Sequence, residues 1–492
     1  MIDEDVSNLH YALFSELDNE EEKNVMFFRG NRTSRKDLES LDIPFASEVY
    51  IFGQPSETDT DLKNLNCLNI ISSICENYKR KPMCYVSLTD INAHALTRTS
   101  NVLTETNKTD IEFVSINFEE SWAKIILVDN KSNKSGIHYL PLDRNGISEK
   151  STQHVHLFII GMSKMGESLA LLAAHIAHYP NHVTKSIKTK ITLVDEDIQS
   201  FKDEFCHKYE SYFSLATHSQ KTFRGNSVQE KNYTPTEDYL DIEWEFIESK
   251  PTNSELMAYL EKIAKDTDAI LTLALCYESA EKNNNIALYL PDSLYDTSVQ
   301  ILTRQNISSL ISRYSNTKYS NIKPFGMTDE GICVEMDKTE TFAKELNFNY
   351  AYGRIPEPKD KKEIEKEWRK LPVVKKWSNL YSAMSIPTFW RSISCTDNYT
   401  PIIMSEVEHN RWNTEELLLG YRPVNEQEYA DVCKKPELKK ILKNNYIHFD
   451  IRPFNELVEL NHQNVIIYDA MKIDYILNYY NNTSDTSQTD KS

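Results

Sequence analysis

The feature that most constrains this chain is a short apolar run that ends in a glycine turn and passes into a helical pattern. The run is His154–Ile160, the turn is residues 161–166, and the helical pattern covers Glu167–His178. Only 11 of the 492 residues are glycine, so two glycines that bracket one turn are informative. A strand, a glycine turn and a helix in this order form a setting in which N–H groups at a helix start can bind phosphate.

Residues 161–166 are therefore predicted to bind a nucleotide. The turn consists of Gly161, Met162, Ser163, Lys164, Met165 and Gly166. Gly161 would make the tight turn, and Gly166 would let the helix pack closely against the strand. Ser163 stands where the dinucleotide-binding pattern has a glycine. Because serine is small and its hydroxyl can bond phosphate, this departure weakens the site without excluding it.

The following elements predict the fold of this region. A second strand, Lys190–Val194, ends at Asp195 and Glu196, where an acid can accept a hydrogen bond from an adenosine ribose. Further strands are expected at 242–248, 269–276, 299–303 and 321–325, with helices at 253–265 and 277–290. Strands that alternate with helices indicate an α/β protein with a doubly wound, Rossmann-like parallel sheet.

The glycine turn and the acidic strand end give residues 151–335 a family resemblance. They resemble the nucleotide-binding domains of potassium-uptake regulators. That resemblance implies NAD or another adenine nucleotide as the bound cofactor, held by the turn together with Asp195 and Glu196.

Residues 1–150 are predicted to form a smaller α/β unit. Strands are expected at 48–53, 83–88, 111–117 and 124–128, and a helix at 62–79. The unit is similar to half of a second nucleotide-type domain, and it contains no phosphate-binding turn. We expect a structural or dimerising role, since an open sheet edge is commonly covered by a partner.

Near the other end of the chain, Ser405–Pro423 concentrates polar and aromatic residues on one helix. Its candidate ligand-binding residues are Glu408, His409, Arg411, Trp412, Asn413, Tyr421 and Arg422. Gly420 marks the helix end. A tryptophan beside an arginine and a histidine suits a planar, anionic ligand. The alternative is an amphipathic helix whose tryptophan fills a small core and whose charges are solvated.

Three motifs in this part of the chain occur in a recognisable order. They are Glu408-His-Asn-Arg-Trp412, the Leu-Leu-Gly-Tyr-Arg-Pro that follows it, and His448–Leu457 with Tyr468-Asp469. Together they resemble a ryanodine-receptor repeat domain over residues 396–480. The resemblance implies a small helical module that packs or senses a ligand. In the calcium-release channels such repeats are linked to adenine nucleotides through the tryptophan.

The remaining segments and the composition limit the possible functions. Residues 336–395 are expected to be a helical linker, and residues 481–492 a disordered tail. The chain has 55 basic and 74 acidic residues, a net charge of −19, which argues against non-specific nucleic-acid binding. No apolar run is long enough to span a membrane and no signal peptide is recognisable, so a cytoplasmic protein is expected. Eight scattered cysteines fit reduced thiols.

Two hypotheses about function follow. The first is a non-catalytic regulatory protein that senses a nucleotide or nucleotide-derived small molecule. It would act as a homo-oligomer, and a membrane protein is a possible partner. Ion homeostasis and antiphage or stress signalling are the settings that the resemblances imply. The alternative is a nucleotide-acting enzyme, an oxidoreductase or a nucleotide-cleaving one, for which no catalytic acid–base pair can be named. His175 and His178 share a helix face, but without a recognisable third ligand a metal site is not expected.

Overall fold

The computed structural model describes most of the chain, which forms two compact units. The described residues are 2–3, 24–53, 59–88, 111, 113–132, 134–224, 227–306, 317–328, 330, 338–396, 400–460 and 463–489. The first unit comprises Met1–Phe118 with Lys370–Lys375, and the second comprises Glu119–Arg369 with Lys376–Ser492. Residues 119–150 therefore pack with the second unit, although the sequence grouped them with the first.

The first unit contains a three-stranded parallel sheet. Its strands β3 (Glu48–Ile51), β4 (Met83–Ser87) and β5 (Phe113–Ile116) lie in chain order. Helix α3 (Thr60–Cys75) packs on this sheet and buries Leu68 and Ile71 in a core with Cys84 and Val86. The short elements are β1 (Ile2–Asp3), β2 (Phe28–Arg29), α2 (Arg35–Glu39) and a 3-10 turn (Ile43–Phe45).

The strand expected at 124–128 is instead helical. Helix α6 (Phe118–Lys124) continues into a π-helical turn, Ile125–Asp129, in which the residues from Ile125 to Val128 are all buried. A short apolar run that is buried on every side carries no period that separates strand from helix. The prediction was wrong for that reason.

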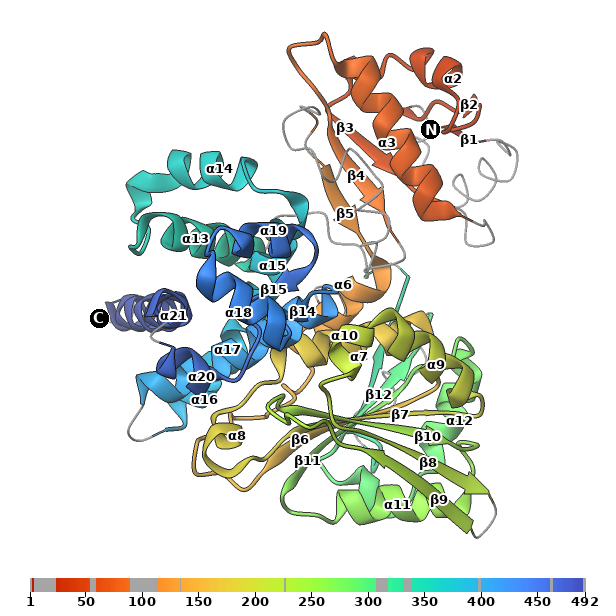
Figure 1. Ribbon diagram of the computed structural model, residues 1–492. Helices are drawn as coiled ribbons and strands as arrows, with labels where there is room; N and C mark the ends of the chain where they lie inside the picture. The colour runs from red at the N-terminus through yellow and green to blue at the C-terminus, as the bar shows by residue number, and fades with distance from the viewer. Residues whose placement is uncertain are drawn as a thin grey trace. The chain divides into compact units, whose positions relative to one another are not determined.

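The second unit is built on an eight-stranded, mostly parallel sheet (Figure 1). Its strands are β6 (His154–Ile160), β7 (Thr189–Asp195), β8 (His218–Arg224), β9 (Ser227–Tyr233), β10 (Ile242–Glu248), β11 (Ala269–Leu275), β12 (Gln300–Arg304) and β13 (Ile322–Phe325). Their order is β13-β12-β11-β6-β7-β10-β8-β9, and only β9 is antiparallel to its neighbour. The first strand, β6, thus lies inside the sheet, and successive strands are added on either side of it.

Helices cover both faces of this sheet. One face carries α7 (Lys164–Ile176), α9 (Ile198–Lys208) and α10 (Glu210–Phe213), and α8 (Pro180–Lys185) lies at its edge (Figure 1). The other carries α11 (Ser254–Ala264) and α12 (Ala280–Leu288), whose Leu260 and Ile286 join a core with Phe158 and Leu273. The strands of this sheet present apolar side chains on both faces, and helices therefore cover both faces.

The remainder of the second unit is helical. Its elements are α13 (Lys338–Tyr352), α14 (Lys361–Arg369), α15 (Val373–Met384), α16 (Ile386–Ser394), α17 (Pro401–Leu418), α18 (Glu426–Lys434), α19 (Leu438–Asn444), α20 (Phe454–Glu459) and α21 (Gln463–Thr489), with the short strands β14 (Arg422–Pro423) and β15 (Ile447–His448). Helix α17 packs against α20 and α21 and also against α7, α8 and α10 of the sheet. Within the described ranges, no helix is long and apolar enough to cross a membrane.

The end of the chain differs from its prediction. Helix α21 extends to Thr489, so residues 481–489 are helical where the composition predicts a disordered tail. Residues 490–492 of that predicted tail lie outside the described residues. The helix continues because its preceding turns are fixed by packing on α13, α16 and α17, and propagation of an existing helix costs far less than starting one.

Candidate functional site

The glycine turn forms where β6 reaches the carboxyl edge of the sheet. Gly161 has φ +93°, a conformation that side chains disfavour. A Cβ added there would lie 2.7 Å from the Tyr277 nitrogen and 2.8 Å from its ring carbon Cγ. The backbone N–H of Gly161 donates to the carbonyl of Val194 at 2.9 Å, which holds the turn beside β7. Glycine at 161 is thus required by both conformation and space.

Ser163 caps the helix that begins at the turn. Its hydroxyl oxygen accepts a hydrogen bond from the Gly166 N–H at 3.4 Å and its hydroxyl donates to the Cys276 carbonyl at 2.6 Å. A Cβ on Gly166 would lie 3.0 Å from the Gly161 carbonyl oxygen and 3.3 Å from Ile159 Cγ2. Serine in place of a second glycine therefore ties the turn to the end of β11, and Gly166 permits close packing of α7 on β6.

Asp195, at the end of β7, lies beside the turn. Its Oδ2 accepts a hydrogen bond from the Met162 N–H at 2.8 Å, and its Oδ1 accepts one from the Asp197 N–H at 3.1 Å. Both oxygens of this carboxylate therefore already bond the backbone. A carboxylate oxygen has two lone pairs, so Asp195 retains capacity for a further donor such as a hydroxyl.

The other predicted residues of the turn differ in exposure. Met165, in the first turn of α7, is fully buried, whereas the side chains of Lys164 and Glu196 are exposed. Helix geometry leaves the N–H groups of Lys164 and Met165 without intrahelical acceptors. The groups that can hold an anion are therefore the first backbone N–H groups of α7 and the Lys164 ammonium.

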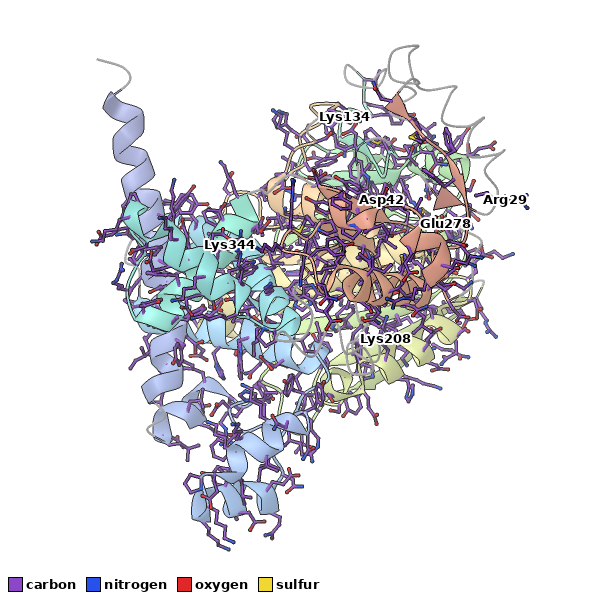
Figure 2. All side chains as sticks on the ribbon, turned by 90° about the horizontal axis from the view of Figure 1, so that it is seen from above. Arg29, Asp42, Lys134, Lys208, Glu278 and Lys344 are labelled. Carbon is purple, nitrogen blue, oxygen red and sulfur yellow. The ribbon has the colours of Figure 1, made fainter. Side chains whose placement is uncertain are left out.

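Sequence reasoning missed the residues that the neighbouring strands bring to this edge. Arg304, the last residue of β12, places Nη1 3.3 Å from the Ser163 Oγ and 2.8 Å from a carboxylate oxygen of Glu278. Lys282 lies 3.6 Å from Glu196. The side chains of Glu278 and of Lys208, which pairs with Glu167 of α7 at 3.2 Å, are labelled in Figure 2. Position in the sequence could have identified Arg304 and Glu278, because each lies one or two residues after the end of a predicted strand.

Cys276 adjoins the turn but is not arranged as a nucleophile. It is fully buried, and burial raises the pKa of its thiol to about 12. A thiol of this kind stays protonated at neutral pH and is inert.

The predicted ligand face on α17 is largely interior. Glu408, His409, Arg411 and Asn413 are all buried. Arg411 donates through Nε and Nη2 to the two Glu408 oxygens at 2.8 and 2.9 Å, and through Nη1 to Glu415. Burial opposes ionisation of Glu408, but Arg411 and Lys472 outweigh it and hold its pKa below the usual range.

The expectation that Arg411 contacts an anionic ligand does not match this location. Its guanidinium is enclosed in an internal ion-pair network, which helix spacing alone could not reveal. The side chains of His409 and Asn413 likewise bond a group inside the C-terminal helices. His409 Nε2 lies 3.0 Å from the Arg452 carbonyl oxygen, and Asn413 donates to the same oxygen at 2.9 Å.

Trp412 and Tyr421 are the predicted residues that keep partial exposure. The ring of Trp412 stacks beside His409 with centroids 5.5 Å apart and meets His448 edge-on at 5.0 Å. Tyr421 packs against Tyr446, centroids 5.1 Å apart. These rings form an aromatic cluster at the module surface. Arg422 is exposed and pairs with Glu428 at 2.7 Å, so that its side chain stabilises the start of α18.

His175 lies in α7 and His178 lies two residues beyond its end, and the structure gives each of them contacts within the protein. His178 bonds through Nδ1 to Asp241 at 2.8 Å and lies through Nε2 2.8 Å from the Ala174 carbonyl oxygen. His175 stacks on Tyr381. Across the part of the chain that the structure describes, no group of three or more His, Cys, Asp or Glu side chains has metal-binding geometry.

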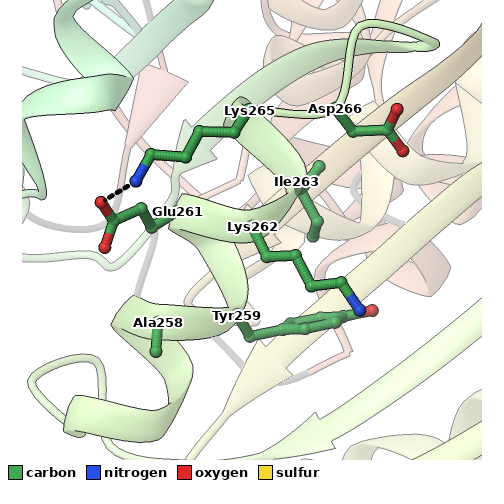
Figure 3. A pocket seen from close by; sticks show the side chains of 7 residues that line it. All are labelled: Ala258, Tyr259, Glu261, Lys262, Ile263, Lys265 and Asp266. Carbon is green, nitrogen blue, oxygen red and sulfur yellow. Dashed lines mark hydrogen bonds and ion pairs between the residues drawn. The ribbon is translucent and has the colours of Figure 1, made fainter.

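A shallow groove along α11 offers no converging functional groups. It is lined by Ala258, Tyr259, Glu261, Lys262, Ile263, Lys265 and Asp266 (Figure 3). Glu261 and Lys265 pair with each other at 2.6 Å along the helix. The Tyr259 hydroxyl donates to Glu245, a fully buried carboxylate in β10 that also pairs with Lys221 at 2.7 Å. Tyr259, Glu261 and Lys265 are therefore already paired, either with each other or with Glu245 inside the sheet.

Comparison with known proteins gives no assignment for this chain: no family model matches it, and no curated protein matches it.

Proposed function

We propose that the second unit binds an adenine nucleotide at the carboxyl edge of its sheet and acts as a non-catalytic regulatory protein. The observation that carries this proposal is the strand order. When β8 and β9, which lie beyond β10 at one end of the sheet, are left out, the strands β10-β7-β6-β11-β12-β13 have the order 3-2-1-4-5-6 that is typical of dinucleotide-binding, Rossmann-like sheets. Ligands of such sheets bind outside the carboxyl ends of the strands, where the order reverses. Here that point lies between β6 and β11.

The local geometry supports an anionic ligand at this point. Gly161 and Ser163 shape the turn, α7 directs its first N–H groups outward, and Arg304 lies beside the Ser163 hydroxyl at 3.3 Å. Asp195 lies on the β7 side, where it can accept from a ribose hydroxyl. A phosphate at the helix start and a ribose at Asp195 together define a nucleotide.

We further propose that the C-terminal helices are a ryanodine-receptor-like module that senses a nucleotide-derived ligand. The aromatic cluster of Trp412, Tyr421, Tyr446 and His448 supports this proposal, since a partly exposed tryptophan can stack a base. Because Arg411 is enclosed in internal ion pairs, the proposed ligand contact is this aromatic cluster and not the Arg411 guanidinium.

The test of the first proposal is direct. Small molecules released from the purified, denatured protein are identified by mass spectrometry, and ADP, ATP, ADP-ribose and NAD are then titrated by calorimetry. A ligand at a hundred times its Kd should add about 2.7 kcal/mol to the free energy of unfolding. Conversion of any nucleotide during incubation would instead favour the enzyme hypothesis.

Matched charge reversals locate the site. Lys164→Glu places a negative charge at the start of α7 and should weaken binding at least ~10-fold, a loss of about 1.4 kcal/mol. Lys262→Glu makes the same change at an exposed lysine of α11, on the opposite face of the sheet, and should bind as the parent does. Equal affinity of the two variants would contradict binding at the turn.

The C-terminal module is tested separately. Trp412→Phe keeps an apolar ring in the cluster and should retain the fold while losing part of a stacking contact worth about 1–3 kcal/mol. A thermal-shift response to every nucleotide equal to that of the parent would refute sensing at Trp412. Homo-oligomer formation also remains a prediction, and light scattering with and without ligand decides it.

A further inference from the structure

Three side chains of the protein itself lie at the carboxyl edge of the sheet, on the β11 side of the point between β6 and β11 where the strand order reverses. Tyr277, Glu278 and Arg304, here called the β11-side cluster, lie at the ends of β11 and β12. The Tyr277 ring rests on Gly161, since a Cβ at Gly161 would meet ring carbons Cγ and Cδ2 at 2.8 and 2.9 Å. The ring therefore lies directly over the start of the glycine turn.

The position of Tyr277 is fixed from two directions. The side chain of Asn283, itself fully buried, accepts from the Tyr277 N–H at 3.0 Å and donates to its carbonyl at 2.8 Å. The Lys282 ammonium lies 3.4 Å from the centre of the Tyr277 ring and holds it by a cation–π contact. The ring is thus clamped between Gly161 and Lys282.

Arg304 closes the same side from β12. Its Nη1 bridges the Ser163 hydroxyl at 3.3 Å and Glu278 at 2.8 Å, and its side chain is only 12% exposed. The Glu278 carboxylate reaches it from the segment after β11, with a side chain that is 74% exposed. An incoming phosphate can replace this solvated carboxylate on Arg304, because phosphate also accepts paired hydrogen bonds from a guanidinium.

The β7 side of this edge of the sheet is different. There the turn meets Asp195, which bonds the Met162 N–H, and no side chain of the β11-side cluster donates to Asp195 among the contacts of the described residues. Burial, and then the charges of Asp195 and Glu196, raise the pKa of the Tyr277 phenol and keep it neutral. The two sides therefore differ: the clamped Tyr277 ring lies on the β11 side and the Asp195 carboxylate on the β7 side. Lys282 links them, because its ammonium lies over the ring and also 3.6 Å from Glu196.

We propose that this site takes a single adenine nucleotide and excludes the second half of a dinucleotide. A dinucleotide places one nucleoside on each side of the point where the strand order reverses. In this chain the adenosine ribose lies toward Asp195, the diphosphate lies at the start of α7 beside Arg304, and Tyr277 occupies the place of the second nucleoside. Tyr277 is thereby a specificity-determining residue. This inference rests on the proposed function of the turn.

The test is the ratio of the Kd for NAD to the Kd for ADP, measured by calorimetry in each variant. The parent should prefer ADP at least ~10-fold, and Tyr277→Ala should lower that ratio at least ~10-fold, equivalent to about 1.4 kcal/mol. Tyr277→Phe preserves the ring and should keep the parent ratio. Tyr289→Ala removes a tyrosine that is 83% exposed at the end of α12, as a matched control, and should also keep it.

The outcomes separate this inference from the proposed function. If NAD binds the parent as tightly as ADP, or if Tyr277→Ala leaves the ratio unchanged, the site still binds nucleotides and the inference alone is overturned. If neither ADP nor NAD binds the parent or any variant, the proposed function is wrong and the inference fails with it. Thermal unfolding of each variant checks that the compared proteins are folded.

Discussion

The imidazole of His175 lies flat on the phenol ring of Tyr381, with centroids 4.0 Å apart and 12° between the ring planes. His175 belongs to α7, the helix that begins at the glycine turn, and Tyr381 belongs to α15. The Tyr381 hydroxyl continues the contact by donating to Glu120 of α6 at 3.2 Å. The helix behind the proposed nucleotide site is therefore joined to the C-terminal helices by a defined pair of rings.

The energetic coupling of these two rings can be measured. We expect a double-mutant cycle of His175→Ala and Tyr381→Ala to give a coupling of about 0.5–1.5 kcal/mol, the range for stacked aromatic pairs. Denaturant unfolding of the parent, both single variants and the double variant supplies the four free energies. Additive effects would show that the stacked geometry contributes nothing beyond burial.

Glu120 should make stability depend on pH. Burial raises its pKa to about 7, against a lowering by the Tyr381 hydrogen bond. The folded state therefore holds this proton more tightly than the unfolded chain. The folding stability gained from this protonation is complete below pH ~4.5 and is lost as pH rises through about 7.

The Glu120→Gln variant removes that titration. Relative to the parent, it should gain roughly 1–3 kcal/mol in unfolding free energy between pH 5 and pH 8. Urea unfolding of both proteins at several pH values gives the difference. Parallel pH profiles for parent and variant would mean that Glu120 titrates normally.

Gly166 should tolerate only the smallest addition. A methyl group at this position would lie 3.0 Å from the Gly161 carbonyl oxygen, so α7 must move by a few tenths of an ångström. We expect Gly166→Val to destabilise the protein by about 1–3 kcal/mol through overpacking and to lose nucleotide binding with the displaced turn. Thermal unfolding and calorimetry measure the two effects, with Gly166→Ala as the milder comparison. Full affinity in the valine variant would separate the turn from the ligand.

Two arginines of the C-terminal helices should respond very differently to the same substitution. Arg411→Met leaves Glu408 and Glu415 buried without their shared partner and should cost about 3–5 kcal/mol. Arg422→Met breaks only the Arg422–Glu428 pair at the surface, worth about 0–1 kcal/mol. Similar melting temperatures for both variants would argue against a stabilising role of the internal network.

The sequence predicted the sheet where apolar runs mark buried strands. β6, β7, β10 and β11 were located to within one or two residues, because strands buried on both faces are rich in apolar residues. β8 and β9 were missed, since the segment that includes Gln220 and Lys221 reads as polar. It pairs at the edge of the sheet, where one face meets solvent.

The candidate site was predictable only in part. The glycine turn and Asp195 follow two successive predicted strands, so the sequence relates them. Arg304 and Tyr277 become neighbours of the turn only through the order of the strands. Arg411 illustrates the opposite failure. Its charge and helix position suggest a surface contact, and only the packing of α17 and α21 shows that it is enclosed.

Helix α17 has almost no solvent-facing side: from Met404 to Leu419 every residue is buried except Glu406 and Trp412, which are half-buried. Part of that burial is provided by α7, α8 and α10, which all lie before Ser214 in the chain. Ribosomes add roughly 5–20 residues per second from the N-terminus, so the sheet is synthesised through Phe325 several seconds before α17 emerges. During that interval α7 presents an uncovered apolar surface, and nascent chains that stall before Pro401 should depend on chaperones to remain dispersed.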